Sequence, residues 1–152
     1  MARAKYHVLV LPYQKHGDTT LYCIFKRSDT DIWQFIAGGG ETEDASPLIS
    51  AKREANEEAG ISCKAKFLAM ETTSSISTEG FKKARSVWGK DCLVIPEYCF
   101  AVDLPDGAVT LSSEHTSFEW VDYATAVQRL KYDSNKVALW ELESKIKMGL
   151  IL

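Results

Sequence analysis

The segment from residue 46 to residue 60 constrains the fold most, because it marks both ends of a helix. Ser46 is a favourable N-cap, and Pro47 follows at the first helical position, where its missing N–H costs nothing. Gly60 is placed to end the helix at a C-terminal cap. The remaining spacing gives the helix one apolar stripe that must pack against other elements, formed by Leu48, Ala51, Ala55 and Ala59.

A second side of this helix is acidic. Glu54, Glu57 and Glu58 occupy positions i, i+3 and i+4, so their side chains project from one face. Like charges at this spacing repel each other, and folding alone gives no reason to accumulate them. The simpler alternative is a solvated helix surface on which Lys52 and Arg53 balance the charge. A bound cation would explain the cluster better.

The glycines at 38–40 place a permissive backbone just before the acidic helix. No Gly-Lys-Ser/Thr follows them, which excludes an ATPase P-loop, and their spacing is not that of a dinucleotide-binding loop. Helix carboxylates together with a free backbone carbonyl form an oxygen-rich ligand set that suits Mg²⁺ or Mn²⁺. A divalent cation held in this way is the usual partner of a di- or triphosphate. Arg53 could hold one of the carboxylates through a bidentate pair.

The composition narrows the class of protein. We expect one domain over residues 1–152, and a net charge of −3 gives no basic field for a nucleic-acid polymer or an anionic membrane. Near the N-terminus the only apolar run is VLVLP, too short for a signal peptide or a membrane span. The four cysteines lack a CxxC pair, so we expect buried, reduced thiols in a cytoplasmic protein. Whether the chain forms a homodimer stays open.

Strand and helix patterns alternate irregularly along the chain. Besides the helix above, we expect five strands, at 6–13, 21–27, 63–73, 92–104 and 117–121, and two helices, at 122–130 and 134–149. The polar stretch between the third and fourth strands is expected to be a loop. In the last helix we expect an inward face formed by Val137, Leu139, Trp140 and Ile146. Without regular βαβ alternation, this order indicates a mixed sheet with helices on both sides.

The acidic helix also resembles a family signature. Residues 53–61, REANEEAGI, match the helical part of the Nudix box, Gly-x5-Glu-x7-Arg-Glu-U-x-Glu-Glu-x-Gly-U, in which U is aliphatic. Counting back from Arg53, the leading glycine falls on Gly39; seven of the nine defined positions match, and Ala55 fills an eighth acceptably. The first glutamate of the box is replaced by Ala45. The arginine could instead be contacted by Asp44, Glu43 or Glu41.

The flanking segments resemble Nudix hydrolases too, so the likeness covers most of the chain. DIWQFIAGG is similar to the approach to the box, and SSEHTSFEWVD to a later strand. The resemblance implies an α+β fold, the Nudix α/β/α sandwich with a mixed β-sheet between helices. It also implies that Arg53 orients Glu54 or Glu57 at a magnesium or manganese site. The implied metal ligands are the Gly39 carbonyl, Glu54, Glu57 and Glu58. Two candidates remain for the general base, Glu57 and Glu114.

Glu114 and His115 are candidate site residues outside the box. In the implied fold, their loop would come near the metal. A carboxylate there could bind an extra metal or take a proton from water, and a histidine could touch a phosphate. The simpler alternative is a polar turn before a strand.

Basic and aromatic residues elsewhere are candidate substrate contacts. Lys26 and Arg27 end a strand just before the predicted metal region and could contact phosphate. Within the segment 81–91, Arg85 and Trp88 could hold phosphate and stack on a ring. The alternative is that these side chains are simply solvated.

Two longer stretches resemble one group within the family. FKRSDTDIWQF and CFAVDLPDGAVTLSSEHTSFEWVDYATAVQRLKYDSNKVAL are similar in order and spacing to the dATP pyrophosphohydrolase or dihydroneopterin triphosphate pyrophosphatase group. The resemblance implies a Mg²⁺-dependent enzyme that releases pyrophosphate from a small nucleoside or pterin triphosphate, by water attack at phosphorus, leaving a monophosphate. Two alternatives remain. One is a dinucleoside polyphosphate hydrolase with the same box; the other is a nucleotide-binding Nudix module with weakened catalysis, which Ala45 favours.

Overall fold

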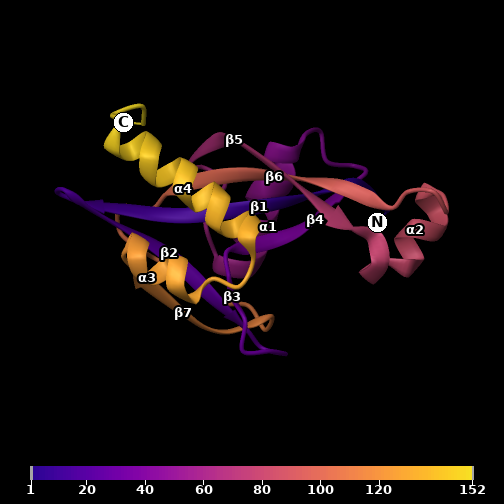
Figure 1. Cartoon of the computed structure of the whole chain (residues 1–152), viewed down its shortest axis with the longest axis horizontal. Coiled ribbons are helices and arrows are strands. Elements are labelled where there is room, and N and C mark those ends of the chain that lie inside the picture. The colour runs from indigo at the N-terminus through magenta and orange to yellow at the C-terminus, as the bar shows by residue number, and fades with distance from the viewer. Residues whose placement is uncertain (1, 152) are drawn as a thin grey trace.

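The computed structural model describes residues 2–151 and shows a β-sheet with helices on both faces (Figure 1). The described residues form seven strands of one mixed sheet, four α-helices and a 3₁₀ turn. The strands are β1 (Arg3–His16), β2 (Thr19–Arg27), β3 (Trp33–Gln34), β4 (Ile36–Glu41), β5 (Lys66–Ser77), β6 (Val94–Asp103) and β7 (His115–Val121). The helices are α1 (Pro47–Ala59), η1 (Thr78–Gly80), α2 (Lys82–Trp88), α3 (Tyr123–Arg129) and α4 (Asp133–Lys147).

Strand β1 is the centre of the sheet and pairs with three others. β6 runs parallel to it, in register from His7 opposite Glu97 onward. The other edge of β1 is divided, because β4 pairs antiparallel with its first part and β2 with its last four residues. This division places the glycine run of β4 beside the N-terminal half of β1, where Gly38 lies opposite Val8.

Helix α1 covers one face of the sheet, and its predicted ends are confirmed. Ser46 accepts a hydrogen bond from the Ile49 N–H at 3.4 Å, and Gly60 ends the helix with a left-handed φ of 67°. The predicted apolar stripe packs against Val8, Val10 and their neighbours, with complete burial of Ala51, Ala55 and Ala59. Because alanine side chains are small, the helix backbone can approach the sheet closely.

Helices α3 and α4 cover the opposite face, and the predicted inward side of α4 is partly wrong. Val137 and Trp140 are 54% and 63% exposed. The buried stripe follows the spacing i, i+3, i+4 and i+7 and consists of Asn135, Ala138, Leu139 and Leu142. The buried stripe therefore includes a polar and a small residue, Asn135 and Ala138, that the prediction left out. Asn135 can be buried because its Oδ1 accepts a hydrogen bond from the Phe35 N–H at 2.8 Å.

The predicted fold class, a mixed sheet between helices, is confirmed, while several details differ. The strands β3 and β4 were not among the five predicted strands. The polar stretch expected to be a loop contains η1 and the short helix α2, which lies at one end of the molecule (Figure 1). All four cysteines are free, but only Cys23 and Cys99 are buried, and Cys63 is exposed. Within residues 2–151, no helix has both the length and the apolar character needed to span a membrane.

Candidate active site

The acidic face of α1 lies against the glycines of β4. A Cβ atom at Gly38 would lie 2.2 Å from Glu54 Cδ, so any larger residue there would displace the glutamate. On the other side of the strand, the guanidinium of Arg3 covers Gly39, where a Cβ atom would lie 2.6 Å from Nη1. The glycines therefore allow two charged side chains to approach the β4 backbone from opposite faces.

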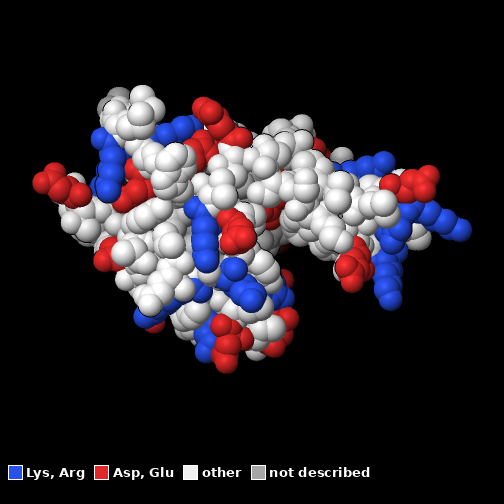
Figure 2. Space-filling model, in the orientation of Figure 1, with Lys and Arg blue, Asp and Glu red and all other residues white. Residues whose placement is uncertain are grey.

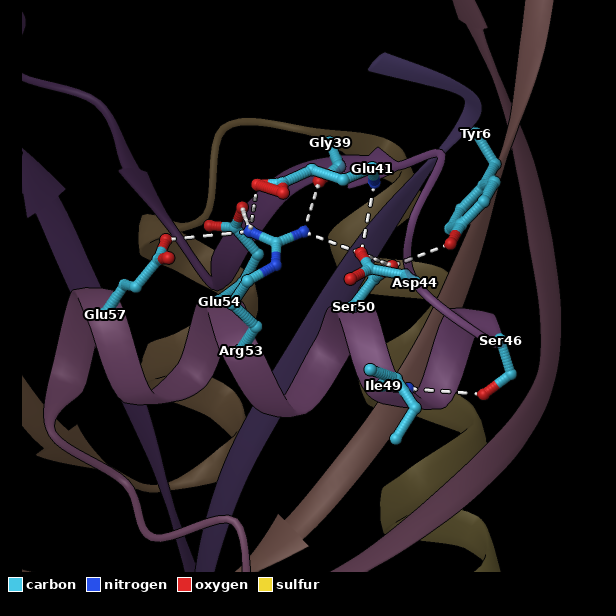
Figure 3. Close-up of polar contacts among 10 residues, drawn as sticks. All are labelled: Tyr6, Gly39, Glu41, Asp44, Ser46, Ile49, Ser50, Arg53, Glu54 and Glu57. Atoms are coloured by element: carbon cyan, nitrogen blue, oxygen red, sulfur yellow. Dashed lines mark hydrogen bonds and ion pairs between the residues drawn. The ribbon is translucent and has the colours of Figure 1, made fainter. Parts of the chain in front are cut away.

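Arg53 is the centre of the polar network on this side of α1 (Figure 3). Its Nη1 lies 3.0 Å from Glu54 Oε1, 3.4 Å from Glu41 Oε1 and 3.6 Å from Glu57 Oε2. Its Nη2 donates a hydrogen bond to the Gly39 carbonyl at 3.1 Å. One guanidinium thus links two of the predicted metal-binding carboxylates to the backbone carbonyl predicted to bind with them.

Asp44 contacts the arginine from the loop before α1. Ala45, which replaces the first glutamate of the box, is exposed, whereas the preceding Asp44 accepts a hydrogen bond from Arg53 Nη2 at 2.9 Å. Among the described residues, Glu43 forms no ion pair with the arginine. Burial alone would lower the pKa of Arg53, but hydrogen bonds to Asp44 and Glu54 raise that pKa above its ordinary value. The guanidinium therefore stays charged.

Glu58 is the most buried of the three helix glutamates, with 3% exposure. Its Oε2 has no hydrogen-bond partner within residues 2–151. Burial raises the pKa of Glu58, and the neighbouring carboxylates of Glu114 and Glu54 raise it further. Burial also raises the pKa of Glu54, with Arg53 opposing the shift. Because Glu57 is 57% exposed, the electrostatic cost of the cluster lies mainly at Glu54 and Glu58.

The structure brings the predicted pair Glu114 and His115 to the buried side of this cluster. His115 is 5% exposed, and its Nδ1 lies 3.9 Å from Glu58 Oε1. Within the described part of the chain, neither ring nitrogen of His115 has a hydrogen-bond partner. Burial lowers the pKa of His115, which keeps its ring neutral near pH 7. A neutral imidazole of this kind could donate a hydrogen bond to a ligand or accept one.

The two predicted phosphate contacts at the end of β2, Lys26 and Arg27, differ in their position relative to the site. Arg27 pairs in register with His115 and therefore reaches the edge of the site. Its guanidinium forms two hydrogen bonds with Asp29, at 2.8 and 3.0 Å. Lys26 continues the alternation of β2 onto the face covered by α3 and α4, away from α1, and pairs with Asp31 at 2.9 Å. Arg27 is accordingly the better placed of the two.

Helix α2 connects to the site through an arginine that the sequence did not single out. Arg85 donates hydrogen bonds to the Lys90 carbonyl, whereas Trp88 Nε1 donates to the Arg3 carbonyl at 2.9 Å. The Arg3 guanidinium lies 4.9 Å from the ring centroid of Phe81. On the face seen in Figure 2, Lys and Arg side chains gather at the α2 end of the molecule.

Arg3 also lines an open cavity of about 230 Å³ beside the acidic helix, together with Gly39, Gly40, Glu41, Arg53, Glu54 and Glu57. Sequence reasoning missed this residue because its place depends on the pairing of β1 with β4, in which Arg3 lies opposite Glu41. No local spacing in the sequence signals that contact.

The carboxylates are arranged around Arg53 and not around a shared centre. Within residues 2–151, no three His, Cys, Asp or Glu side chains are placed so that they could hold a metal ion. The chemistry of the donors nevertheless fits Mg²⁺ or Mn²⁺, since the Gly39 carbonyl and the helix carboxylates are hard oxygen ligands. Glu58 Oε2 is buried and unpartnered, as expected for an atom that has a further ligand to meet. Binding would require Glu54 and Glu57 to exchange part of their contact with Arg53 for the cation.

The mixed sheet, the glycine strand and the acidic helix agree with the resemblance to Nudix hydrolases, and comparison with known proteins identifies the family. The NUDIX domain profile matches residues 4–140, so the chain belongs to the Nudix family of pyrophosphohydrolases. The dihydroneopterin triphosphate diphosphatase of Escherichia coli (strain K12) is 27% identical over 133 residues, which cover 87% of each chain.

Two solved structures extend the comparison. A Listeria monocytogenes protein assigned as a NUDIX hydrolase is 39% identical, with a TM-score of 0.85 over 96% of this chain and 97% of its own. The Escherichia coli dihydroneopterin triphosphate pyrophosphohydrolase has a TM-score of 0.74 at 21% identity, over 94% of this chain and 99% of its own. At that level of identity, the second match supports the fold alone.

Proposed function

We propose that this chain is a Mg²⁺- or Mn²⁺-dependent pyrophosphohydrolase that converts a small nucleoside or pterin triphosphate into the monophosphate and pyrophosphate. The observation that carries this proposal is the contact of Arg53 with Glu54, Glu57 and the Gly39 carbonyl, with Glu58 buried one residue further along the same helix. The similarity to the Escherichia coli dihydroneopterin triphosphate diphosphatase supports a triphosphate as the substrate.

The cation would be held by the Gly39 carbonyl and by the carboxylates of Glu54, Glu57 and Glu58. When bound, such a cation offsets phosphate charge and makes a coordinated water more acidic. Arg53 would position two of these carboxylates, since its Nη1 contacts both Glu54 and Glu57 and limits the positions that these side chains can adopt. The neutral ring of His115 lies beside Glu58 and could contact the phosphate chain.

In the proposed reaction, the oxygen of a water molecule attacks phosphorus, and the bond from that phosphorus to the pyrophosphate oxygen breaks. The water gives up a proton to a carboxylate, and pyrophosphate leaves with the electron pair of the broken bond. Glu57 and Glu114 both stay candidates for the base, because each is exposed and next to the buried carboxylates. Arg27 and the newly found Arg3 lie on two sides of the site and are the candidates for contact with the outer phosphates.

Lys26, Arg85 and Trp88 are weaker candidates for direct contact with the substrate. The side chain of Lys26 faces the opposite side of the sheet, and Arg85 is engaged with the loop that follows its own helix. Trp88 could affect the site through the hydrogen bond that it donates to the Arg3 carbonyl. The nucleotide-binding alternative rests on Ala45, and the hydrogen bond between Asp44 and Arg53 makes that alternative weaker.

A substrate panel tests the proposal. Nucleoside triphosphates, a pterin triphosphate, dinucleoside polyphosphates and diphosphate sugars would be incubated with Mg²⁺ or Mn²⁺, and the products separated by ion-exchange chromatography. We expect pyrophosphate and a monophosphate from at least one triphosphate, with loss of the activity in Glu57→Gln and retention in the exposed control Glu79→Gln. Cleavage of dinucleoside polyphosphates alone would favour that alternative. No hydrolysis of any substrate would favour the binding module.

A further inference from the structure

Asp44 is the meeting point of three hydrogen bonds in the loop before α1 (Figure 3). Its Oδ2 accepts from Arg53 Nη2 at 2.9 Å, from Ser50 Oγ at 2.5 Å and from the Glu41 N–H at 3.0 Å. The side chain is only 9% exposed. Burial alone would raise the pKa of Asp44, but these hydrogen bonds outweigh it and lower the pKa below its ordinary value. The carboxylate therefore stays charged beside Arg53.

Two residues from other elements fix the orientation of this carboxylate. Ser50, which is completely buried in α1, uses its only hydroxyl proton to donate to Asp44. The Tyr6 hydroxyl, 2.6 Å from Ser50 Oγ, must then be the donor in that pair. The Tyr6 ring packs against Gly40, where a Cβ atom would lie 2.3 Å from Cζ. A directed chain thus runs from the Tyr6 hydroxyl through Ser50 to Asp44, where it meets Arg53.

The other acidic neighbour of Arg53 is held less firmly. Glu41 Oε1 lies 3.4 Å from Nη1, beyond an ideal hydrogen bond, and Glu41 Oε2 is buried without a partner among the described residues. Ala45 itself carries no polar side-chain group and is exposed. Of Glu41, Asp44 and Ala45, Asp44 is therefore the residue that holds the arginine most firmly.

We propose that Asp44, oriented by Ser50 and Tyr6, is a positioning residue that replaces the missing box glutamate and directs Arg53 toward the cation-binding carboxylates. This role presupposes the proposed function and adds to it a residue at a position where the Nudix signature defines none. Asp44 and the Gly39 carbonyl hold Nη2, which leaves Nη1 aimed at Glu54. Without Asp44, the guanidinium would lose this restraint. Its positive charge would then be held less firmly beside the helix carboxylates, and their mutual repulsion would be offset less.

The test compares Asp44→Ala, the near-isosteric Asp44→Asn and the double variant Asp44→Ala/Ala45→Glu. Glu43→Gln is the matched control, since it removes the same charge from an exposed position in the same loop. Binding of Mn²⁺ alone would be measured by calorimetry, thermal unfolding would be followed without metal, and kcat and KM would be determined with an active triphosphate and Mg²⁺.

We expect Asp44→Ala to weaken Mn²⁺ binding and to lower kcat by about 10- to 100-fold each, with KM changed less than about threefold. Asp44→Asn should fall between Asp44→Ala and the wild type, and Glu43→Gln should match the wild type. The double variant should recover to within about threefold of wild type, which a purely structural defect in the loop would not allow. If Asp44→Ala fails to fold, Asp44→Asn supplies the same comparison.

Equal Mn²⁺ uptake by the wild type and Asp44→Ala, whether strong or absent, would overturn this role for Asp44. So would a loss of kcat that Ala45→Glu does not restore. If the wild type hydrolyses no triphosphate, the proposed function fails. The Mn²⁺ comparison then still decides whether Asp44 supports the cation site.

Discussion

Burial of Glu97 should make the contribution of this residue to stability fall as the pH rises. Glu97 lies on β6, 4% exposed, directly between His7 of β1 and Ser74 of β5. Burial raises the pKa of Glu97 from 4.5 to about 7. Burial and Arg3 lower the pKa of His7 to about 4, so that ring is neutral near pH 7 and supplies no positive charge to the carboxylate. Glu97→Gln should therefore stabilise the protein at alkaline pH.

The direction and size of this effect on the unfolding free energy follow from the raised pKa of Glu97. A carboxyl with a higher pKa in the fold than in the unfolded chain favours folding while it is protonated, below about pH 4.5. That contribution is lost as the pH rises through about 7. At about 1.4 kcal/mol per pH unit, the difference between 4.5 and about 7 corresponds to about 3 kcal/mol of unfolding free energy.

Urea denaturation at about pH 5 and about pH 8.5 would measure the effect. We expect the unfolding free energy of Glu97→Gln, relative to wild type, to rise by about 2 to 3 kcal/mol between these conditions. Contributions from His7 are common to both proteins and cancel in the difference. The exposed control Glu79→Gln should show no comparable rise. A Glu97→Gln difference that stays constant with pH within about 0.5 kcal/mol would refute the assignment of a buried, uncompensated carboxyl.

Further substitutions test the site and its supporting helix. Arg53→Lys should lower kcat by about 10- to 100-fold in steady-state assays, because an ammonium group cannot hold several carboxylates as a guanidinium does. Gly38→Ala should weaken Mn²⁺ binding in calorimetry by displacing Glu54, and unchanged binding would contradict the close approach at β4. Ser46→Ala should cost about 1 kcal/mol in urea denaturation through loss of the N-cap, with equal stability counting against it. Ala45→Glu alone should change kcat by less than about threefold, since Asp44 already holds the arginine.

Features set by near neighbours in the chain could be predicted from the sequence. Both ends of α1 were predicted because Ser46 and Gly60 cap the helix through contacts within a few residues. The common face of Glu54 and Glu58 likewise follows from helical spacing alone. The fold class was accessible for a related reason, since strand and helix patterns are local, and the resemblance to the Nudix box added the order of layers.

Features set by distant pairing could not be predicted in the same way. Arg3 reaches the site only because β1 pairs with β4, and Tyr6 reaches Ser50 across 44 positions of sequence. The buried face of α4, from which Trp140 is excluded, could not be predicted either, because the face of a helix that becomes buried depends on which residues fit the sheet. A large indole with 63% exposure shows that apolar character alone did not decide which face is buried.

The acidic partner of Arg53 is determined both by neighbours in the chain and by contacts with more distant elements. Sequence placed Asp44, Glu43 and Glu41 within reach of the arginine but could not rank them, since loop direction depends on how β4 leaves the sheet. The ranking is decided by Ser50 in α1, whose buried hydroxyl must donate to an acceptor, and that acceptor is Asp44. A serine at a buried helix position is thus what converts a nearby aspartate into a fixed support for the arginine. Ser50→Ala should consequently loosen Asp44 and reproduce part of the Asp44→Asn phenotype, even though the Ser50 side chain is hydrogen-bonded to Tyr6 and Asp44 and does not line the cavity beside the acidic helix.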